Sequence, residues 1–344
     1  MAQASMQQNE RLTRLSVSKI RTCQESTLVT GRFAVRSKEL PRDYKNKDGK
    51  FFFFEVGDKT GNILVKYWGG PDGEKTVELF NSLKVGDLVE ISGVVEKDKY
   101  DGRLGIAINE GANKIERIGN LSDLVGKAEN ASEYIPTSDK IEECFTKLRK
   151  YANSIDDSYL RALVLLFLGN PSFSEAFKTV PGTSLNHHNY LGGNLEHTLA
   201  VTELCIKMCE IHPLDRDLLV AASILHDVGK VKEYVAEVSI ELTDEGKFLG
   251  HVHIGIIMIS EMIRNIPQFP EETASKLLHV IVNHHGAPDT GIAKGVRLPE
   301  ACALNLANTL DMRVKEFVQV KLEMADSPEN WVYARNLGTD IYLK

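Results

Sequence analysis

The sequence lacks the features that mark secreted, membrane-spanning and fibrous proteins. Its 344 residues include five cysteines with no Cys-x-x-Cys pair, which argues against a zinc ribbon or a disulfide framework. No run of about 18 apolar residues is present, so we expect no membrane-spanning helix and no membrane partner. The N-terminal stretch MAQASMQQNERLTR is polar and has no signal-peptide core, and we therefore expect a cytoplasmic protein. An apolar content of 42% with 26% charged residues excludes a disordered chain.

The distributions of charge and of histidine both differ between the first and second parts of the chain. The formal net charge is −7, so the whole chain lacks the basic excess typical of many nucleic-acid-binding proteins. Residues 1–120 nevertheless carry 20 basic and 17 acidic side chains, whereas the remainder carries 21 and 31. Histidine is absent from the first 186 residues, and all ten histidines lie between His187 and His285. Because histidine is the commonest metal ligand and proton carrier near neutral pH, we expect the chemistry in the second part.

The first part has the pattern of a small β-barrel. Five alternating or β-branched runs are separated by turn residues such as Lys-Asp-Gly and Val-Gly-Asp. These runs are Leu28–Val35, Lys50–Val56, Asn62–Trp68, Asp87–Glu96 and Arg103–Ile108. Helical spacing over Lys75–Leu83, between the third and fourth runs, is what an OB-fold requires. We therefore expect a five-stranded OB β-barrel at residues 13–118 that binds nucleic acid, after a polar tail at 1–12.

The second part has the pattern of an all-α domain, so the predicted fold is a multi-domain α and β protein. Apolar residues at i, i+3 and i+4 recur in Asn194–Ile211, Asp215–Val228, Pro270–His284 and Glu300–Ala325. We expect a linker at 119–137, the helical domain at 138–327 and a C-terminal segment at 328–344. The stretch Trp331–Lys344 is either an interface of a homo-oligomer or a tail.

The segment Ile224–Lys230, with the sequence ILHDVGK, carries the strongest chemical signal. An apolar helix brings His226 and Asp227 side by side at its C-terminal end. Because a buried carboxylate must be paired or bound to a metal, other elements have to complete its surroundings. Residues suited to that purpose follow or precede it on separate predicted elements: His197, His251, His284, His285 and Asp311.

With these residues in this order, the sequence resembles the HD-domain metal-dependent phosphohydrolases over about residues 138–325. The resemblance implies one metal held by His197, His226, Asp227 and Asp311, and a second metal, bridged by Asp227, held by His251, His284 and His285. His253, two residues after His251, is the alternative ligand at that point. A lone histidine on an apolar helix face is more often a core residue, but seven candidate ligands in this order favour a metal site.

The donor set of imidazoles and carboxylates predicts the metal and the reaction. It suits Mn²⁺ or Fe, with Co²⁺ or Ni²⁺ as substitutes, better than Mg²⁺. Two such ions activate water as the nucleophile in phosphoester hydrolysis. Lys230, about one turn after His226, is a candidate to neutralise a phosphate oxygen. His188 precedes the first ligand helix and either contacts the phosphate or caps the loop.

Side-chain alternation assigns a binding face to the predicted barrel. Phe52, Phe54 and Val56 share one parity and should fill the core, which leaves the opposite parity outside. The outward set that we predict to contact nucleic acid is Arg32, Arg36, Phe51, Phe53, Lys66 and Trp68. Aromatic platforms with basic side chains are how OB-folds hold single strands. The alternative is that these aromatic rings pack against the helical domain.

An OB barrel placed before an HD domain resembles the YhaM-like 3′–5′ exoribonuclease family. Similar motifs are Asn186–His188 (NHH), Leu225–Lys230 (LHDVGK), Leu249–His251 (LGH) and Asn283–Gly286 (NHHG). The family implies Mn²⁺-dependent trimming of single-stranded RNA, and sometimes DNA, from the 3′ end. Two alternatives stay open: an HD phosphodiesterase acting on a small or cyclic nucleotide, and a non-catalytic single-strand-binding protein. Cyclic-dinucleotide phosphodiesterases are disfavoured, since the Gly-Tyr-Pro signature is missing after His285.

Overall fold

The structure is a computed structural model that describes residues 14–98, 102–120, 133–134, 136–183, 190–236, 240–286, 295–324, 327, 329–334 and 337–344. The expected polar tail at 1–12, most of the expected linker and His188 therefore lie outside the described residues. Two compact units are present: Met1–Pro136 with Asp326–Val332, and Thr137–Ala325 with Tyr333–Lys344. Each unit has its own hydrophobic core. The domain limits expected from the sequence stay predictions.

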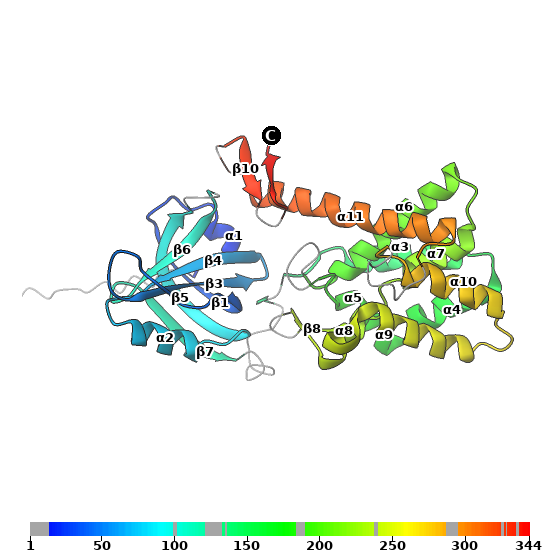
Figure 1. The fold of residues 1–344 in the computed structure, drawn as a ribbon, viewed down its shortest axis with the longest axis horizontal. Coiled ribbons are helices and arrows are strands. Elements are labelled where there is room, and N and C mark those ends of the chain that lie inside the picture. Colours follow the sequence, from blue (N-terminus) through cyan, green and yellow to red (C-terminus); the bar gives the residue numbers. More distant parts are fainter. Residues whose placement is uncertain are drawn as a thin grey trace, which may run out of the picture. The chain divides into compact units, whose positions relative to one another are not determined.

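The first unit is a β-barrel in which five strands close on themselves (Figure 1). They are β1 (Leu28–Lys38), β3 (Lys50–Asp58), β4 (Gly61–Trp68), β5 (Asp87–Lys97) and β6 (Leu104–Asn109). β1 pairs with both β3 and β5, whereas β4 pairs in parallel with β6, so the sheet returns to its first strand. Helix α2 (Gly73–Ser82) connects β4 to β5. The expected OB-fold is confirmed.

Short elements that the sequence pattern did not predict extend this barrel. They are α1 (Val17–Ile20), β2 (Arg42–Asp43), which pairs with β3, and β7 (Lys114–Asn120), which pairs with β5. Alternation within the strands is as expected, because Phe52, Phe54 and Val56 are each at most 1% exposed. Burying one such ring contributes about 1.5–3 kcal/mol to the free energy of folding.

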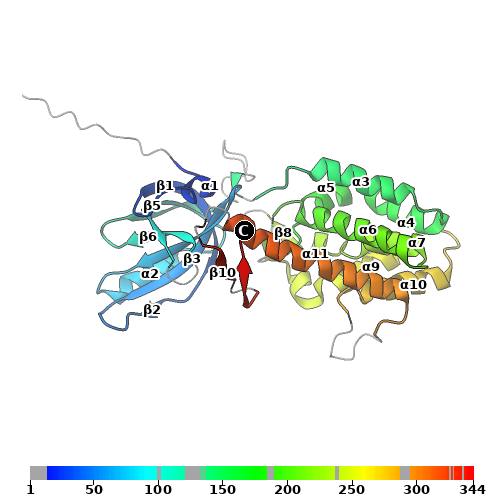
Figure 2. The same cartoon turned by 90° about the horizontal axis from the view of Figure 1, so that it is seen from above.

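The second unit is a helical domain. Its helices are α3 (Ile141–Asn153), α4 (Ser158–Gly169), α5 (Pro171–Thr179), α6 (Gly193–Ile211), α7 (Arg216–Leu225), α8 (Lys230–Glu233), α9 (Asp244–Arg264), α10 (Glu271–Val282) and α11 (Pro299–Glu323). Helix α7 lies in the middle, since every residue from Leu218 to Leu225 is buried. Asp215 caps α7 by accepting a hydrogen bond from the N–H of Leu218. In Figure 2, α11 runs along α6, and the two helices are in contact.

One hairpin departs from the all-α pattern expected at 138–327, and a second lies in the C-terminal segment. β8 (Tyr234–Ala236) pairs with β9 (Ile240–Leu242), and β10 (Trp331–Ala334) pairs with β11 (Thr339–Tyr342). The short β8 follows α8 directly and was not visible as a periodic run. Within the described part of the chain, each helix is too short or too polar to cross a bilayer.

Candidate metal centre and aromatic surface

The centre is built around the end of helix α7. His226 follows the last residue of that helix, and Asp227 comes next, so the buried helix carries both side chains into the interior. His226 is fully buried and Asp227 is 1% exposed. A carboxylate at this depth is stable only when cations or strong hydrogen-bond donors surround it.

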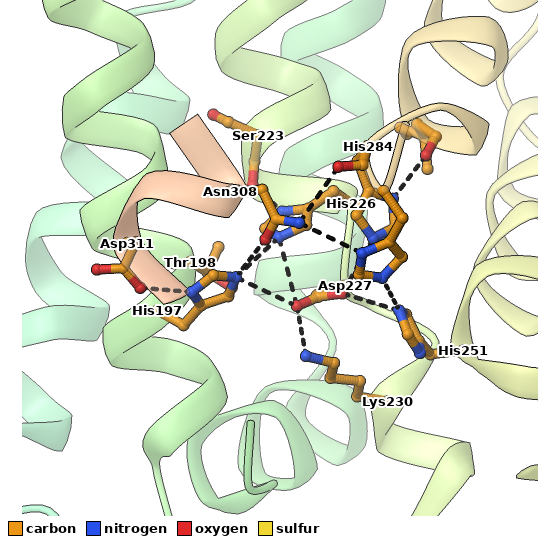
Figure 3. A network of polar contacts seen from close by, with 12 residues as sticks. His197, Thr198, Ser223, His226, Asp227, Lys230, His251, His284, Asn308 and Asp311 are labelled. Carbon is orange, nitrogen blue, oxygen red and sulfur yellow. Dashed lines mark hydrogen bonds and ion pairs between the residues drawn. The ribbon is translucent and has the colours of Figure 1, made fainter. Parts of the chain in front are cut away.

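Asp227 lies between two pairs of imidazoles (Figure 3). Its Oδ2 is 3.3 Å from Nε2 of His226 and 3.7 Å from Nε2 of His197 on α6. Its Oδ1 is 3.5 Å from Nε2 of His251 on α9 and 3.7 Å from Nε2 of His284, which follows α10. Each oxygen of the Asp227 carboxylate therefore faces a separate pair of imidazole Nε2 atoms.

Backbone carbonyls orient two of these rings. Nδ1 of His226 lies 2.7 Å from the carbonyl oxygen of Ser223, and Nδ1 of His284 lies 2.7 Å from that of Ile281. Because a carbonyl oxygen can only accept, Nδ1 carries the hydrogen in both rings. The Nε2 lone pairs of both rings therefore face the carboxylate.

Carboxylates orient the other two rings. Nδ1 of His197 lies 2.6 Å from Oδ2 of Asp311, and Nδ1 of His251 lies 3.1 Å from Oε1 of Glu233. A carboxylate on the outer nitrogen sets the tautomer and makes the inner nitrogen a better metal ligand. The inner Nε2 atoms of all four imidazoles consequently converge on Asp227.

Gly250 explains why His251, and not His253, joins the centre. Gly250 has φ 69° and interrupts the helical path of α9, a conformation that glycine adopts without strain. The N–H of His251 then donates to Oε1 of Glu233 at 2.9 Å. His253 is exposed, and its Nδ1 lies 2.8 Å from the carbonyl oxygen of Leu249.

His285 completes the second group of donors. One potential ligand atom each of His251, His284 and His285 lies within 4.8 Å of the other two. His197, His226 and Asp227 form the other group, which meets the same distance limit. Nε2 of His285 is 3.0 Å from Nε2 of His251. Six of the seven expected ligands are thus brought together in two adjoining groups.

Two buried atoms test whether the centre fits a metal. Among the described residues, Oδ1 of Asp227 and Nε2 of His284 are buried without a hydrogen-bond partner. Both are acceptors and lie 3.7 Å apart, so a cation is the group that would satisfy them. Imidazole nitrogens with one shared carboxylate are ligands that divalent transition metals prefer.

The protonation states agree with metal binding, which requires neutral imidazoles and an ionised carboxylate. Burial lowers the pKa of His197 to about 4 and that of His284 well below its usual value. Burial opposes ionisation of Asp227, but neighbouring positive charge, including the ammonium group of Lys230, outweighs it and holds the pKa of that carboxyl well below its usual range.

A cavity of about 110 Å³ adjoins these ligands. Residues that line it include His197, Lys230, Tyr234, His251, His285 and Met312. Nζ of Lys230 lies 2.7 Å from Oδ2 of Asp227, and the lysine is 7% exposed. The one ammonium group among these lining residues is therefore held at the carboxylate between the two groups of imidazoles.

Asp311 is placed differently from what the sequence led us to expect. It contacts the outer nitrogen of His197 and is not one of the residues grouped around the converging atoms. Asn308, one turn earlier on α11, is 2% exposed and places its Oδ1 2.9 Å from the inner nitrogen of His197. A buried asparagine on the predicted helix was the sequence signal that we missed.

Aromatic side chains gather on the outer surface of the barrel. Phe51 and Phe53 of β3 and Trp68 of β4 have ring centroids 5.4–5.8 Å apart, and Tyr44 lies 5.2 Å from Phe51. These four half-buried rings are called the aromatic surface below. Nζ of Lys47 stands 3.9 Å from the centroid of Tyr44. Tyr44 was not predicted, because it lies in a loop without strand periodicity.

The outward basic residues do not join the aromatic surface as predicted. Lys66 is only 5% exposed, and its Nζ lies 3.2 Å from Asp98 and 3.6 Å from Glu96. Its parity was right, but these two acids, at the end of β5 and just beyond it, enclose the ammonium group.

Arg32 and Arg36 are likewise engaged within the first unit. Nε of Arg32 donates to Glu90 at 2.8 Å, and Arg36 donates to the carbonyl oxygen of Tyr134. Burial lowers the pKa of Arg36 to about 10. Both side chains are bound to partners within the first unit, which alternation along a strand does not reveal.

Comparison with known proteins agrees with both halves of this description. A model of the HD domain matches residues 194–313, and a model of the OB-fold nucleic acid binding domain matches residues 29–112. The 3′–5′ exoribonuclease YhaM of Bacillus licheniformis is 36% identical to this chain over 265 residues, which cover 77% of this chain and 79% of that relative. This chain belongs to the YhaM family. The YhaM protein of Geobacillus sp. is 27% identical to this chain, and the match covers 80% of each protein. The YhaM protein of Shouchella clausii is 28% identical, and the match covers 80% of this chain and 82% of that relative.

Both candidate sites of this YhaM-family chain lie within the matched domains. The HD match includes every expected metal ligand from His197 to Asp311. The OB match includes the aromatic surface from Tyr44 to Trp68. The two domains by which the family was expected from the sequence are therefore confirmed.

Proposed function

We propose that this protein is a metal-dependent 3′–5′ exonuclease that trims single-stranded RNA and also accepts single-stranded DNA in the cytoplasm. The observation that carries the proposal is the carboxylate of Asp227, each of whose oxygens faces its own group of imidazole nitrogens. The curated relatives that the chain matches are named 3′–5′ exoribonucleases, which supports this choice of reaction.

Two divalent transition metals, with Mn²⁺ favoured, suit these two groups of ligands. His197 and His226 would hold one metal, the second group of three histidines would hold the other, and Asp227 would serve both. When bound, a metal pair activates water and neutralises charge on a phosphoryl group. The protein fixes the orientation of these rings, because each of four Nδ1 atoms has an acceptor.

Lys230 is the residue that we assign to the phosphate. Its ammonium group lines the cavity beside Asp227, where it would neutralise a non-bridging phosphate oxygen. The cavity of about 110 Å³ offers room for a phosphodiester beside this ammonium group. His188 stays a predicted phosphate contact, outside the described residues.

The aromatic surface is the part that we assign to holding the strand. Bases of any sequence stack on Phe51, Phe53 and Trp68, and each stacked base contributes about 1–3 kcal/mol. Tyr44 enlarges this platform, and Lys47 beside it provides a positive charge for the backbone. An exonuclease that removes nucleotides one after another needs this tolerance of sequence.

The test uses a 5′-labelled single-stranded RNA, the same RNA closed into a circle, and a matched single-stranded DNA. With Mn²⁺ we expect a ladder that shortens from the 3′ end of both linear strands, no cleavage of the circle, and no activity in EDTA. Asp227→Ala should abolish the ladder, because it removes the carboxylate shared by both groups of ligands. His253→Ala is the matched control and should act as wild type, since His253 lies outside the centre.

Three results would overturn the proposal in different ways. Cleavage of the circle at the rate of the linear strand would indicate an endonuclease. Turnover of mononucleotides or cyclic nucleotides without any shortening of RNA or DNA would indicate a small-nucleotide phosphodiesterase. Equal activity of Asp227→Ala and wild type would show that the centre does not carry the reaction.

A further inference from the structure

Asn308 is a buried polar residue in contact with both groups of ligands, and the HD ligand set expected from the sequence does not include it. We propose that Asn308 provides the oxygen ligand of the metal site formed by His197 and His226, and that Asp311 is a positioning residue that holds His197. The assignment rests on the metal-dependent function proposed above. It replaces Asp311 as the last ligand of that site.

The hydrogen bonds of Asn308 determine which end of its amide faces the centre. The Nδ2 atom lies 3.2 Å from the backbone carbonyl oxygen of His284. That oxygen can only accept, so the amide nitrogen must be the atom that faces it. The Oδ1 atom is consequently the one that lies 2.9 Å from Nε2 of His197.

This arrangement makes two acceptors face each other. Nδ1 of His197 donates its hydrogen to Asp311 at 2.6 Å, so Nε2 of the neutral ring presents a lone pair. Oδ1 of Asn308 presents another lone pair at 2.9 Å, so with His197 neutral no hydrogen lies between the two atoms. Nδ1 of His226 faces the carbonyl oxygen of Ser223, so the neutral ring presents a lone pair at Nε2, which is 3.4 Å from Nε2 of His197. Three acceptors that converge in a buried place indicate a cation as their common partner.

The separations of these acceptors also suit a shared ion. Two ligand atoms each about 2.1 Å from one ion lie about 3.0 Å apart at a right angle and about 3.4 Å apart at a tetrahedral angle. The distances from Nε2 of His197 to Asn308 and to His226 are 2.9 and 3.4 Å.

Asp311, in contrast, lies on the far edge of the His197 ring. Its carboxylate bonds the nitrogen that points away from Asp227, and its side chain is 15% exposed. Glu233 bonds the outer nitrogen of His251 in the same way in the second group. The two carboxylates are therefore equivalent in position, and both orient a histidine without reaching the converging atoms.

The choice of an amide has a measurable consequence. A neutral oxygen leaves Asp227 as the one negative charge among the ligands of this site, so Asn308→Asp should strengthen metal binding and Asn308→Ala should weaken it. Asn305 offers a matched control, because its Nδ2 donates to the same carbonyl of His284 at 3.0 Å. Asn305→Ala loses that hydrogen bond without removing an oxygen from the metal site.

The experiment measures Mn²⁺ stoichiometry and affinity by titration calorimetry on the full chain, with elemental analysis after dialysis. Melting temperatures in EDTA report on folding without metal. We expect two Mn²⁺ ions in wild type and in Asn305→Ala, and a loss of more than about tenfold in affinity at one site in Asn308→Ala. Asn308→Asp should bind at least about tenfold more tightly at that site. Asp311→Asn keeps an acceptor for His197 and should change the affinity by less than Asn308→Ala does.

Several outcomes would overturn the assignment. Wild-type affinity in Asn308→Ala together with the loss of one ion in Asp311→Asn would make Asp311 the ligand. If Asn308→Ala does not fold, unchanged affinity in the nearly isosteric Asn308→Asp would be enough to reject the proposal. Wild-type protein that binds no Mn²⁺ would reject the proposed metal dependence itself, which separates that failure from failure of the Asn308 assignment alone.

Discussion

The metal centre and the aromatic surface differ in how their side chains are held. In the centre, the four imidazoles that face the Asp227 carboxylate each have an acceptor on the outer nitrogen, and most of these groups are buried. On the aromatic surface, half-buried rings contact one another. The proposed function thus assigns the chemistry to side chains held by hydrogen bonds and strand binding to rings that are partly exposed.

The two regions also use charge differently. In the centre, the carboxylate of Asp227 faces several nitrogen donors and one ammonium group. On the barrel, Arg32 and Lys66 are paired with carboxylates of their own unit. Binding by the barrel should therefore depend more on stacking than on phosphate charge, with a shallow dependence on salt.

The largest effect is expected from Glu233, which tests whether preset geometry matters in the centre. Glu233→Ala removes the acceptor of both the N–H and the Nδ1–H of His251, and should lower Mn²⁺ affinity by about 10–100-fold. Glu233→Gln keeps an acceptor oxygen and should restore part of the loss. Titration calorimetry measures both, with His253→Ala as the control. Unchanged affinity in Glu233→Ala would show that the ring is held adequately by its surroundings.

An intermediate effect is expected from the aromatic surface. Trp68→Ala or Phe53→Ala should weaken binding of a single-stranded RNA by about tenfold, within the range for loss of one stacked base. Hydrolysis of bis-p-nitrophenyl phosphate should be unchanged, because this small ester needs only the metal centre. Leu64→Ala, on the same outward parity of β4, is the control. Loss of both activities together would mean that the rings support folding of the barrel.

The smallest effect is expected from single basic residues. Lys47→Ala should weaken RNA binding about two- to threefold and reduce the slope of log affinity against log salt by about one. Arg32→Ala should leave that slope unchanged, because its guanidinium is paired with Glu90. Fluorescence anisotropy over a salt series measures both. Equal changes of slope in the two variants would indicate that the pair with Glu90 opens when RNA binds.

Much of the fold was predictable because the signals are local. The apolar parity of Phe52, Phe54 and Val56 corresponds to the inner face of β3, and the helical spacing before Leu83 corresponds to α2. The barrel's closure was predictable only through the OB-fold pattern as a whole. The pairings of β1 with β5 and of β4 with β6 join strands that are distant in sequence.

Part of the site was predictable for a different reason. Histidine and aspartate beside apolar helix faces are costly to bury without a partner, so His226 and Asp227, followed and preceded by five further candidate ligands, favoured a metal site. The roles of Asn308 and Asp311 were not predictable in the same way. The two residues are one turn apart on α11. The packing of α11 on α6 decides that Asn308 contacts Nε2 of His197 and Asp311 contacts Nδ1.

The sequence by itself determined the two architectures, the inward faces of the strands and the set of histidines of the candidate metal centre, because periodicity and residue type are local properties. Tertiary structure alone decided which partner each polar group meets. Lys66 forms its ion pair with Asp98, and Asn308 contacts Nε2 of His197. The non-helical backbone at Gly250 brings His251, and not His253, into the centre. The physical reason is that hydrogen bonds and ion pairs act over about 3 Å, so they depend on contacts between segments far apart in the chain.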